Sequence, residues 1–103
     1  MIIVKSRNNI PIRLTTERWN HIIRRHPEMD TRKERVLETI TDPDLIQEGD
    51  FGELIAIRFY EKTPLTSKYL VAIYREVEDI DGFVITTYYA TKPSERRHII
   101  WKR

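Results

Sequence analysis

Residues 45–60 read LIQEGDFGELIAIRFY, two strand-like segments separated by a turn. Both segments are rich in β-branched and aromatic side chains, which favour extended structure. The intervening Gly49-Asp50-Phe51-Gly52 has the composition of a turn. A connection this short joins antiparallel neighbours, so this stretch predicts a hairpin within a larger sheet.

The chain continues in the same pattern after residue 60. Further strands are expected at 69–75 and 83–90, with turn-like residues at 63–64 and 79–82. Together with 45–47 and 54–60, these segments predict a four-stranded antiparallel sheet in the form of a meander. For Ile99-Ile100-Trp101 two interpretations remain open, an added edge strand or a segment docked on the sheet.

The N-terminal residues predict a β-hairpin. Strand-like segments at 2–5 and 10–14 flank Arg7-Asn8-Asn9, which is typical of a turn. The hairpin leads directly into the first of two helical segments.

The first helix is predicted to begin after Thr15, a favourable N-cap residue. Its apolar face has the i, i+3, i+4, i+7 spacing and consists of Trp19, Ile22, Ile23 and His26. Pro27 disfavours helical geometry at the residue before it, so the helix should end near His26.

A second helix is expected in the thirties. Thr31 and Glu34 have the spacing of a capping box, and Asp42-Pro43 should end the helix. Its apolar side consists of Val36, Leu37 and Ile40. The predicted fold is therefore α+β, with an N-terminal β-hairpin and two short helices packed on a four-stranded antiparallel sheet.

Length and composition narrow the classes of protein. A chain of 103 residues has room for one core, so residues 1–103 are expected to form a single domain. The chain is 40% hydrophobic and 33% charged, as in ordinary globular proteins. It has no cysteine, which excludes disulfides and cysteine metal sites. No stretch resembles a signal peptide or a membrane span, so we expect a cytoplasmic protein without a membrane partner.

The net charge is only +2, but basic residues are concentrated in two regions. These are Arg18, Arg24, Arg25, Arg32, Lys33 and Arg35 in the helical region, and Lys92, Arg96, Arg97, Lys102 and Arg103 in the tail. One interpretation is a cationic face that binds phosphates, with Arg18, Arg25, Arg96 and Arg97 as RNA-binding candidates. The other is that these charges merely solvate the surface.

The two histidines of the first helix are candidates for acid–base chemistry. His21 and His26 are at i, i+5, so a regular helix cannot direct both at one point. A helical metal site normally needs i, i+4 spacing, and we expect neither a metal nor a cofactor. His26 is either a core or capping residue or a histidine facing a cleft between helix and sheet. His21, beside Arg18 and Arg25, is either a surface residue or a functional one.

Strand alternation adds further candidates. It predicts that Leu54, Ala56, Arg58 and Tyr60 share one side of their strand, and that Val84, Thr86, Tyr88 and Ala90 share one side of theirs. Arg58, Thr86 and Tyr88 either have ordinary structural roles or line an open concave surface with Lys92 just beyond the last strand.

Three stretches together resemble a known family. They are RWNHIIRRHPE at 18–28, DPD at 42–44 and VITTY at 84–88. In this order and spacing they resemble the phage-associated branch of the barnase, EndoU, colicin and RelE nuclease superfamily, which has the BECR fold. The similarity extends over most of the chain, from about Leu14 to Lys92.

The resemblance implies a nuclease that holds RNA, such as tRNA or mRNA, on the open face of the sheet and cleaves it without a metal. The ribose 2′-hydroxyl would attack phosphorus and leave a 2′,3′-cyclic phosphate. By position, His21 or His26 would be the base or acid, Arg58 and Lys92 would supply positive charge, and Thr86 and Tyr88 would orient phosphate or donate a proton. Such domains include toxins.

Two functions of other classes remain open. The chain could bind RNA without cleaving it, using Tyr60, Tyr74 and Tyr88 to stack on bases. Alternatively, the basic helix could dock an acidic partner, an antitoxin or immunity protein.

Overall fold

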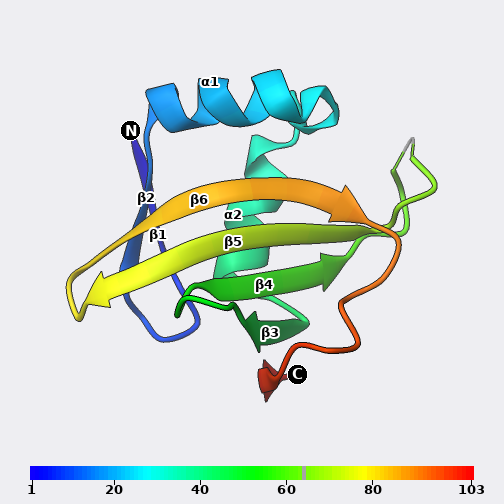
Figure 1. Ribbon diagram of the computed structural model, residues 1–103. Helices are drawn as coiled ribbons and strands as arrows, with labels where there is room; N and C mark the ends of the chain where they lie inside the picture. The colour runs from blue at the N-terminus through cyan, green and yellow to red at the C-terminus, as the bar shows by residue number, and fades with distance from the viewer. Residues whose placement is uncertain (64) are drawn as a thin grey trace.

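The computed structural model describes residues 1–63 and 65–103. Its strands are β1 (Ile2–Lys5), β2 (Pro11–Leu14), β3 (Leu45–Glu48), β4 (Leu54–Phe59), β5 (Tyr69–Glu78), β6 (Asp81–Ala90) and β7 (Ile99–Lys102). Its helices are α1 (Thr16–Arg25), the short 3-10 helix η1 (Pro27–Met29) and α2 (Lys33–Thr41). Figure 1 shows both α-helices and the sheet.

Within the described residues the sheet has seven strands, in the order β1-β2-β6-β5-β4-β3-β7. It is mixed, because β2 runs parallel to β6 through the pair Arg13 and Phe83, whereas the other neighbours are antiparallel. The α+β class is confirmed, but the predicted four-stranded antiparallel sheet is wrong. The four predicted strands form only its centre, since the N-terminal hairpin joins one edge and β7 extends the other.

The hairpin packs closely against β6 at Gly82, where the side chain of Ile12 leaves no room for a Cβ atom. A Cβ atom at this position would lie 2.6 Å from Cδ1 of Ile12 and 2.6 Å from the carbonyl oxygen of Arg75. Glycine therefore permits β2 to lie beside β6. The turn between β5 and β6 is shorter than predicted and consists of Asp79 and Ile80 alone.

The helix boundaries follow local signals at both ends of α1 and at the C-terminus of α2, where Asp42 is the C-cap residue, but not at the N-terminus of α2. Thr15 caps α1 as predicted, because its side chain accepts a 3.0 Å hydrogen bond from the backbone N–H of Arg18. The predicted capping box is wrong: the N-cap of α2 is Arg32, which makes no capping hydrogen bond through its side chain. Thr31 instead adopts a left-handed backbone conformation, with φ of 72°.

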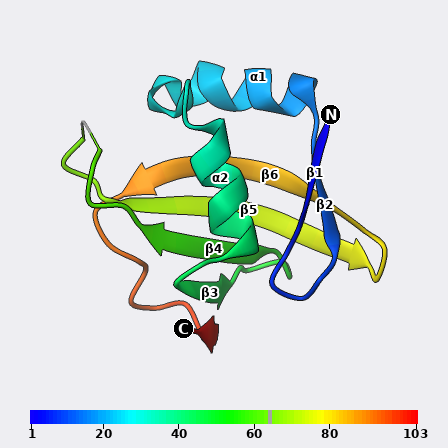
Figure 2. The same cartoon turned by 180° about the vertical axis from the view of Figure 1, so that it is seen from behind.

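The helices lie at different places on the sheet. Helix α2 packs across one face, over β4 and β5, while α1 runs alongside β6 (Figures 1 and 2). The main core lies between the helices and the sheet and includes Trp19, Ile22, Met29, Val36, Ile40, Ala56, Leu70, Tyr74 and Val84. The opposite face, here called the open face, carries a second apolar cluster of Ile55, Ile57 and Val71 with Tyr88 and Ala90 beside it.

A β-bulge in β6 decides which of its side chains reach the open face. Ile73 pairs with Thr86 and Tyr74 pairs with Val84, so Ile85 is an extra residue. Val84 therefore packs in the main core, whereas Thr86 follows Ile73 on the open face. The prediction that Val84 shares a face with Thr86 and Tyr88 is wrong for this reason. The prediction that Leu54, Ala56 and Tyr60 share one face is confirmed, because all three pack in or against the main core.

None of the helices in the described ranges combines the length and apolar character that crossing a membrane would require.

Candidate functional site

The end of α1 brings His26 against the open face of the sheet. His26 is the C-cap residue, and its backbone N–H donates a 2.7 Å hydrogen bond to the carbonyl of Ile22. The imidazole and the ring of Tyr88 have centroids 5.6 Å apart and planes inclined by 31°. His26 is half-buried, so its ring is held by packing while part of it remains accessible. This places two proton-exchanging side chains in contact at the seam between helix and sheet.

A carboxylate completes the surroundings of His26. Nδ1 of His26 lies 3.8 Å from Oε2 of Glu28, which belongs to η1. The imidazole therefore has a phenol ring on one side and a carboxylate close to Nδ1. Glu28 was not among the candidates expected from the sequence, although it belongs to the stretch that carries the family resemblance.

Tyr88 also lines a hollow of about 210 Å³ on the open face, here called the face hollow. Its lining consists of Gln47, Ile55, Ile57, Val71, Tyr88, Ala90, Lys92, Pro93, Ser94 and Arg97. Strands β3 to β6 supply its floor, and the segment after β6 supplies a wall; Figure 1 shows this segment leaving β6 and returning to the C-terminus. Tyr88 thus connects His26 with an apolar hollow.

Two cationic side chains lie in the lining of the face hollow. Lys92 is exposed, and its Nζ is 3.0 Å from Oε1 of Glu95. Arg97 is half-buried, and its Nη1 lies 3.0 Å from Oδ1 of Asp50. An anion at this place would meet two positive charges, each of which already has a carboxylate neighbour.

Arg58 is not part of this arrangement. Its Nη1 lies 3.0 Å from Oδ2 of Asp42, its Nε lies 3.6 Å from Oε1 of Glu38, and its guanidinium stacks on Tyr60. Hydrogen bonds from Arg103 and then Arg58 hold the pKa of Asp42 below its usual value. Because strand alternation directs Arg58 to the face that carries α2, the structure does not bring it together with Thr86 and Tyr88 on the open face.

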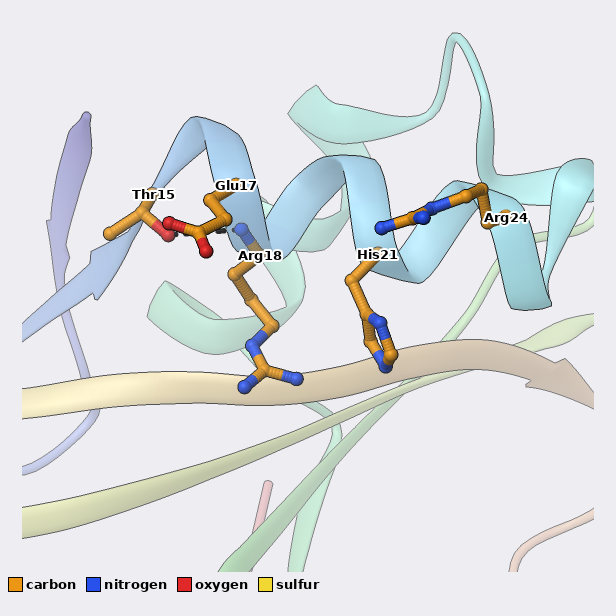
Figure 3. A pocket seen from close by; sticks show the side chains of 5 residues that line it. All are labelled: Thr15, Glu17, Arg18, His21 and Arg24. Atoms are coloured by element: carbon orange, nitrogen blue, oxygen red, sulfur yellow. Dashed lines mark hydrogen bonds between the residues drawn. The ribbon is translucent and has the colours of Figure 1, made fainter.

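His21 lines a different hollow, of about 530 Å³, with Thr15, Glu17, Arg18 and Arg24. Figure 3 shows Arg18 and His21 extending from α1 toward β6. Nη1 of Arg18 donates a 3.3 Å hydrogen bond to the carbonyl of Ile85, the extra residue of the bulge. The expectation that His21 and His26 do not point to one place is consistent with this arrangement, since the ring of His26 packs on Tyr88 whereas His21 lines the hollow beside Arg18.

The remaining candidates lie at separate places. Thr86 is half-buried on the open face, opposite Ile73. Arg25 is exposed at the last turn of α1. Arg96 is exposed beside the face hollow and lines a neighbouring hollow with Asp50, Ser94, Arg97 and His98.

Gln47 is a second residue of the site that was not expected from the sequence. It is 1% exposed, and its Nε2 donates a 2.7 Å hydrogen bond to the carbonyl of Ser94. A polar residue in the middle of a predicted apolar strand was the available signal, but its partner lies in the segment after β6 and is distant in sequence.

Within residues 1–63 and 65–103 the side chains form no cluster of three or more His, Cys, Asp or Glu that could hold a metal ion. No protein-family model matches the chain, and the comparisons with curated proteins and with solved structures also found no match.

Proposed function

We propose that this chain is a metal-independent endoribonuclease that cleaves RNA by attack of the ribose 2′-hydroxyl on the adjacent phosphorus. The observation that carries the proposal is the contact between His26 and Tyr88 beside a hollow with cationic lining. These side chains are of the types that the reaction needs, namely a base, a proton donor and positive charge near the phosphate. A cytoplasmic location, where RNA is abundant, is part of the proposal.

In the proposed reaction, the imidazole of His26 accepts the proton of the 2′-hydroxyl. The 2′-oxygen forms a bond to phosphorus, and the bond between phosphorus and the 5′-oxygen breaks. The hydroxyl of Tyr88 donates a proton to the departing 5′-oxygen, which leaves a 5′-hydroxyl and a 2′,3′-cyclic phosphate. Exchange of protons with water restores both side chains.

The surrounding charges suit this sequence of proton transfers. Glu28 attracts the positive charge that His26 acquires when it accepts a proton. Lys92 offers a cationic donor to the reacting phosphate, on which negative charge accumulates during attack. Each therefore favours the transition state over the starting complex.

The alternative of RNA binding by stacked aromatic residues has less support. Tyr74 is fully buried in the main core. The hydroxyl of Tyr60 donates a 2.6 Å hydrogen bond to Oε1 of Glu38, and its ring packs against Arg35 and Arg58. Of the three tyrosines considered for stacking, Tyr88 alone has its ring at the face hollow.

The test is incubation of the purified protein with total RNA and with tRNA in the presence of EDTA. We expect cleavage that leaves 2′,3′-cyclic ends and is abolished by 2′-deoxy substitution at the cleaved nucleotide. His26→Ala should reduce the rate about 100-fold or more, as for loss of a general acid or base. His21→Ala is the matched control, because it removes a helical histidine that does not contact Tyr88, and it should retain the rate within a few-fold.

Tyr88→Phe separates packing from chemistry, because it keeps the ring beside His26 and removes only the hydroxyl. We expect a lower cleavage rate with unchanged affinity for RNA. The proposal is wrong if no RNA is cleaved over a range of pH, and its site is wrong if folded His26→Ala cleaves like the wild type. Circular dichroism and thermal unfolding show whether each variant is folded.

A further inference from the structure

A second hollow lies beside the face hollow, at the edge of the sheet. This edge hollow has a volume of about 340 Å³ and is lined by Asp50, Ser94, Arg96, Arg97 and His98. Ser94 and Arg97 line both hollows, so the two are adjacent. A ligand that extends across this boundary would meet both sets of side chains.

The face hollow suits a flat ring with an apolar face and a polar edge. Ile55, Ile57 and Val71 belong to its lining, so the floor of the hollow is apolar at the level of the sheet. Tyr88 adds an aromatic ring, against which a base can stack. Its volume is that of about seven molecules of liquid water, which is the size range of one nucleobase.

A buried amide supplies the polar component of the same hollow. Gln47 is held by the hydrogen bond from its Nε2 to the carbonyl of Ser94, so its orientation is defined. An amide carries both a donor and an acceptor, as does the edge of every nucleobase. Its presence in an otherwise apolar floor matches a base better than a purely apolar ligand.

The edge hollow has the chemistry of a phosphate site. Arg96 and Arg97 line it, and Arg97 is held by Asp50. Among the described residues no carboxylate lies within ion-pairing distance of Arg96, so its charge is available for an anion. Bases and phosphates alternate along a nucleic acid strand. Two adjacent hollows, one for a base and one for a phosphate, match this arrangement.

We propose that the face hollow binds one nucleobase of single-stranded RNA and the edge hollow binds a neighbouring phosphate. The substrate class is therefore single-stranded RNA, because a base in a duplex is stacked on both faces and paired at its edge. The inference rests on the proposed function for the identity of the ligand, but it concerns binding and not cleavage.

The experiment measures binding of a fluorescent 2′-O-methyl RNA oligonucleotide, which lacks the attacking hydroxyl and cannot be cleaved. We expect it to bind at least tenfold more tightly as a single strand than as a duplex. A strand of equal length with abasic sites keeps its phosphates and should bind about tenfold more weakly. Ala90→Leu, which narrows the face hollow, should weaken binding of the intact strand without affecting the abasic one.

Arg96→Gln tests the edge hollow, and Lys5→Gln on β1, at the other end of the strand order, is its matched control. Arg96→Gln should reduce the magnitude of the slope of log affinity against log salt concentration by about one. Lys5→Gln should leave this slope unchanged. Equal binding of the duplex, or of the abasic strand, would overturn the inference. Tight single-strand binding without cleavage of ordinary RNA would instead overturn the proposed function and leave this inference standing.

Discussion

The carboxylate of Glu28 lies beside the imidazole of His26, with Oε2 3.8 Å from Nδ1. The two residues are neighbours because Pro27 ends α1 and begins η1, which directs the chain back beside the helix terminus. Both side chains are about one-third exposed, so water screens their attraction. Glu28 is therefore suited to assist His26 modestly, and it is not positioned to replace it.

Glu28→Gln should lower the rate of RNA cleavage by about 1.4- to fivefold, which corresponds to the roughly 0.2–1 kcal/mol typical of a partly exposed ion pair. The substitution removes the charge that stabilises protonated His26 while leaving the open face intact. Single-turnover kinetics and RNA affinity measure the two effects separately. Glu34→Gln, an exposed residue of α2, is the control and should have no effect. A loss as large as that of His26→Ala would assign Glu28 a more direct role.

The bulge at Ile85 predicts consequences of different size for substitutions at two adjacent threonines. Thr87 is fully buried, and its Oγ1 donates a 2.7 Å hydrogen bond to the carbonyl of Val71. Thr87→Val should therefore reduce the free energy of unfolding by about 1 kcal/mol, the net value of such a bond. Thr86→Val, on the open face, should change the free energy of unfolding by a few tenths of a kcal/mol at most. Urea unfolding compares them, and equal losses would mean that the two residues have similar surroundings.

Two tyrosines should respond with opposite sign when their hydroxyl groups are removed. The hydroxyl of Tyr74 is buried and has no hydrogen-bond partner among the described residues, and burial raises its pKa. Tyr74→Phe should thus increase the free energy of unfolding by about 1 kcal/mol. Tyr60→Phe should decrease it by a similar amount, because it removes the bond to Glu38. Thermal unfolding at pH 7 decides this, and a destabilised Tyr74→Phe would indicate a partner, such as bound water, for that hydroxyl.

Asp42 should make the stability of the protein depend on pH below about 4. Hydrogen bonds from Arg103 and Arg58 lower its pKa in the folded state below the ordinary value of 3.8. The ionised carboxylate therefore stabilises the native state fully above pH 3.8, and this contribution is lost as the pH falls through the lower, folded pKa. Chemical unfolding of the wild type and Asp42→Asn should differ at pH 7 and converge toward pH 2. A difference that is constant over this range would contradict the prediction.

Local signals in the sequence predicted the parts of the fold that depend on neighbouring residues. Thr15 and Pro27 define the ends of α1 because capping and steric clashes act within one helical turn. The strand segments at 45–47 and 54–60 were similarly predicted from β propensity and the turn between them. His26, Tyr88 and Lys92 were singled out as candidates, and one interpretation placed Tyr88 on a surface with Lys92, but the contact of His26 with Tyr88 was not predicted.

The tertiary structure decided which strands pair, which faces they present and which candidates meet. The parallel contact of β2 with β6, the added strand β7 and the bulge at Ile85 depend on hydrogen bonds between residues distant in the chain. No short window of sequence contains both partners of such a bond, so periodicity alone could not reveal them. The same reason explains why Arg58 and Tyr88 seemed able to share a surface. Because Ile85 is an extra residue in β6, the side chains that follow it face the side opposite to the one that unbroken alternation from Val84 predicts.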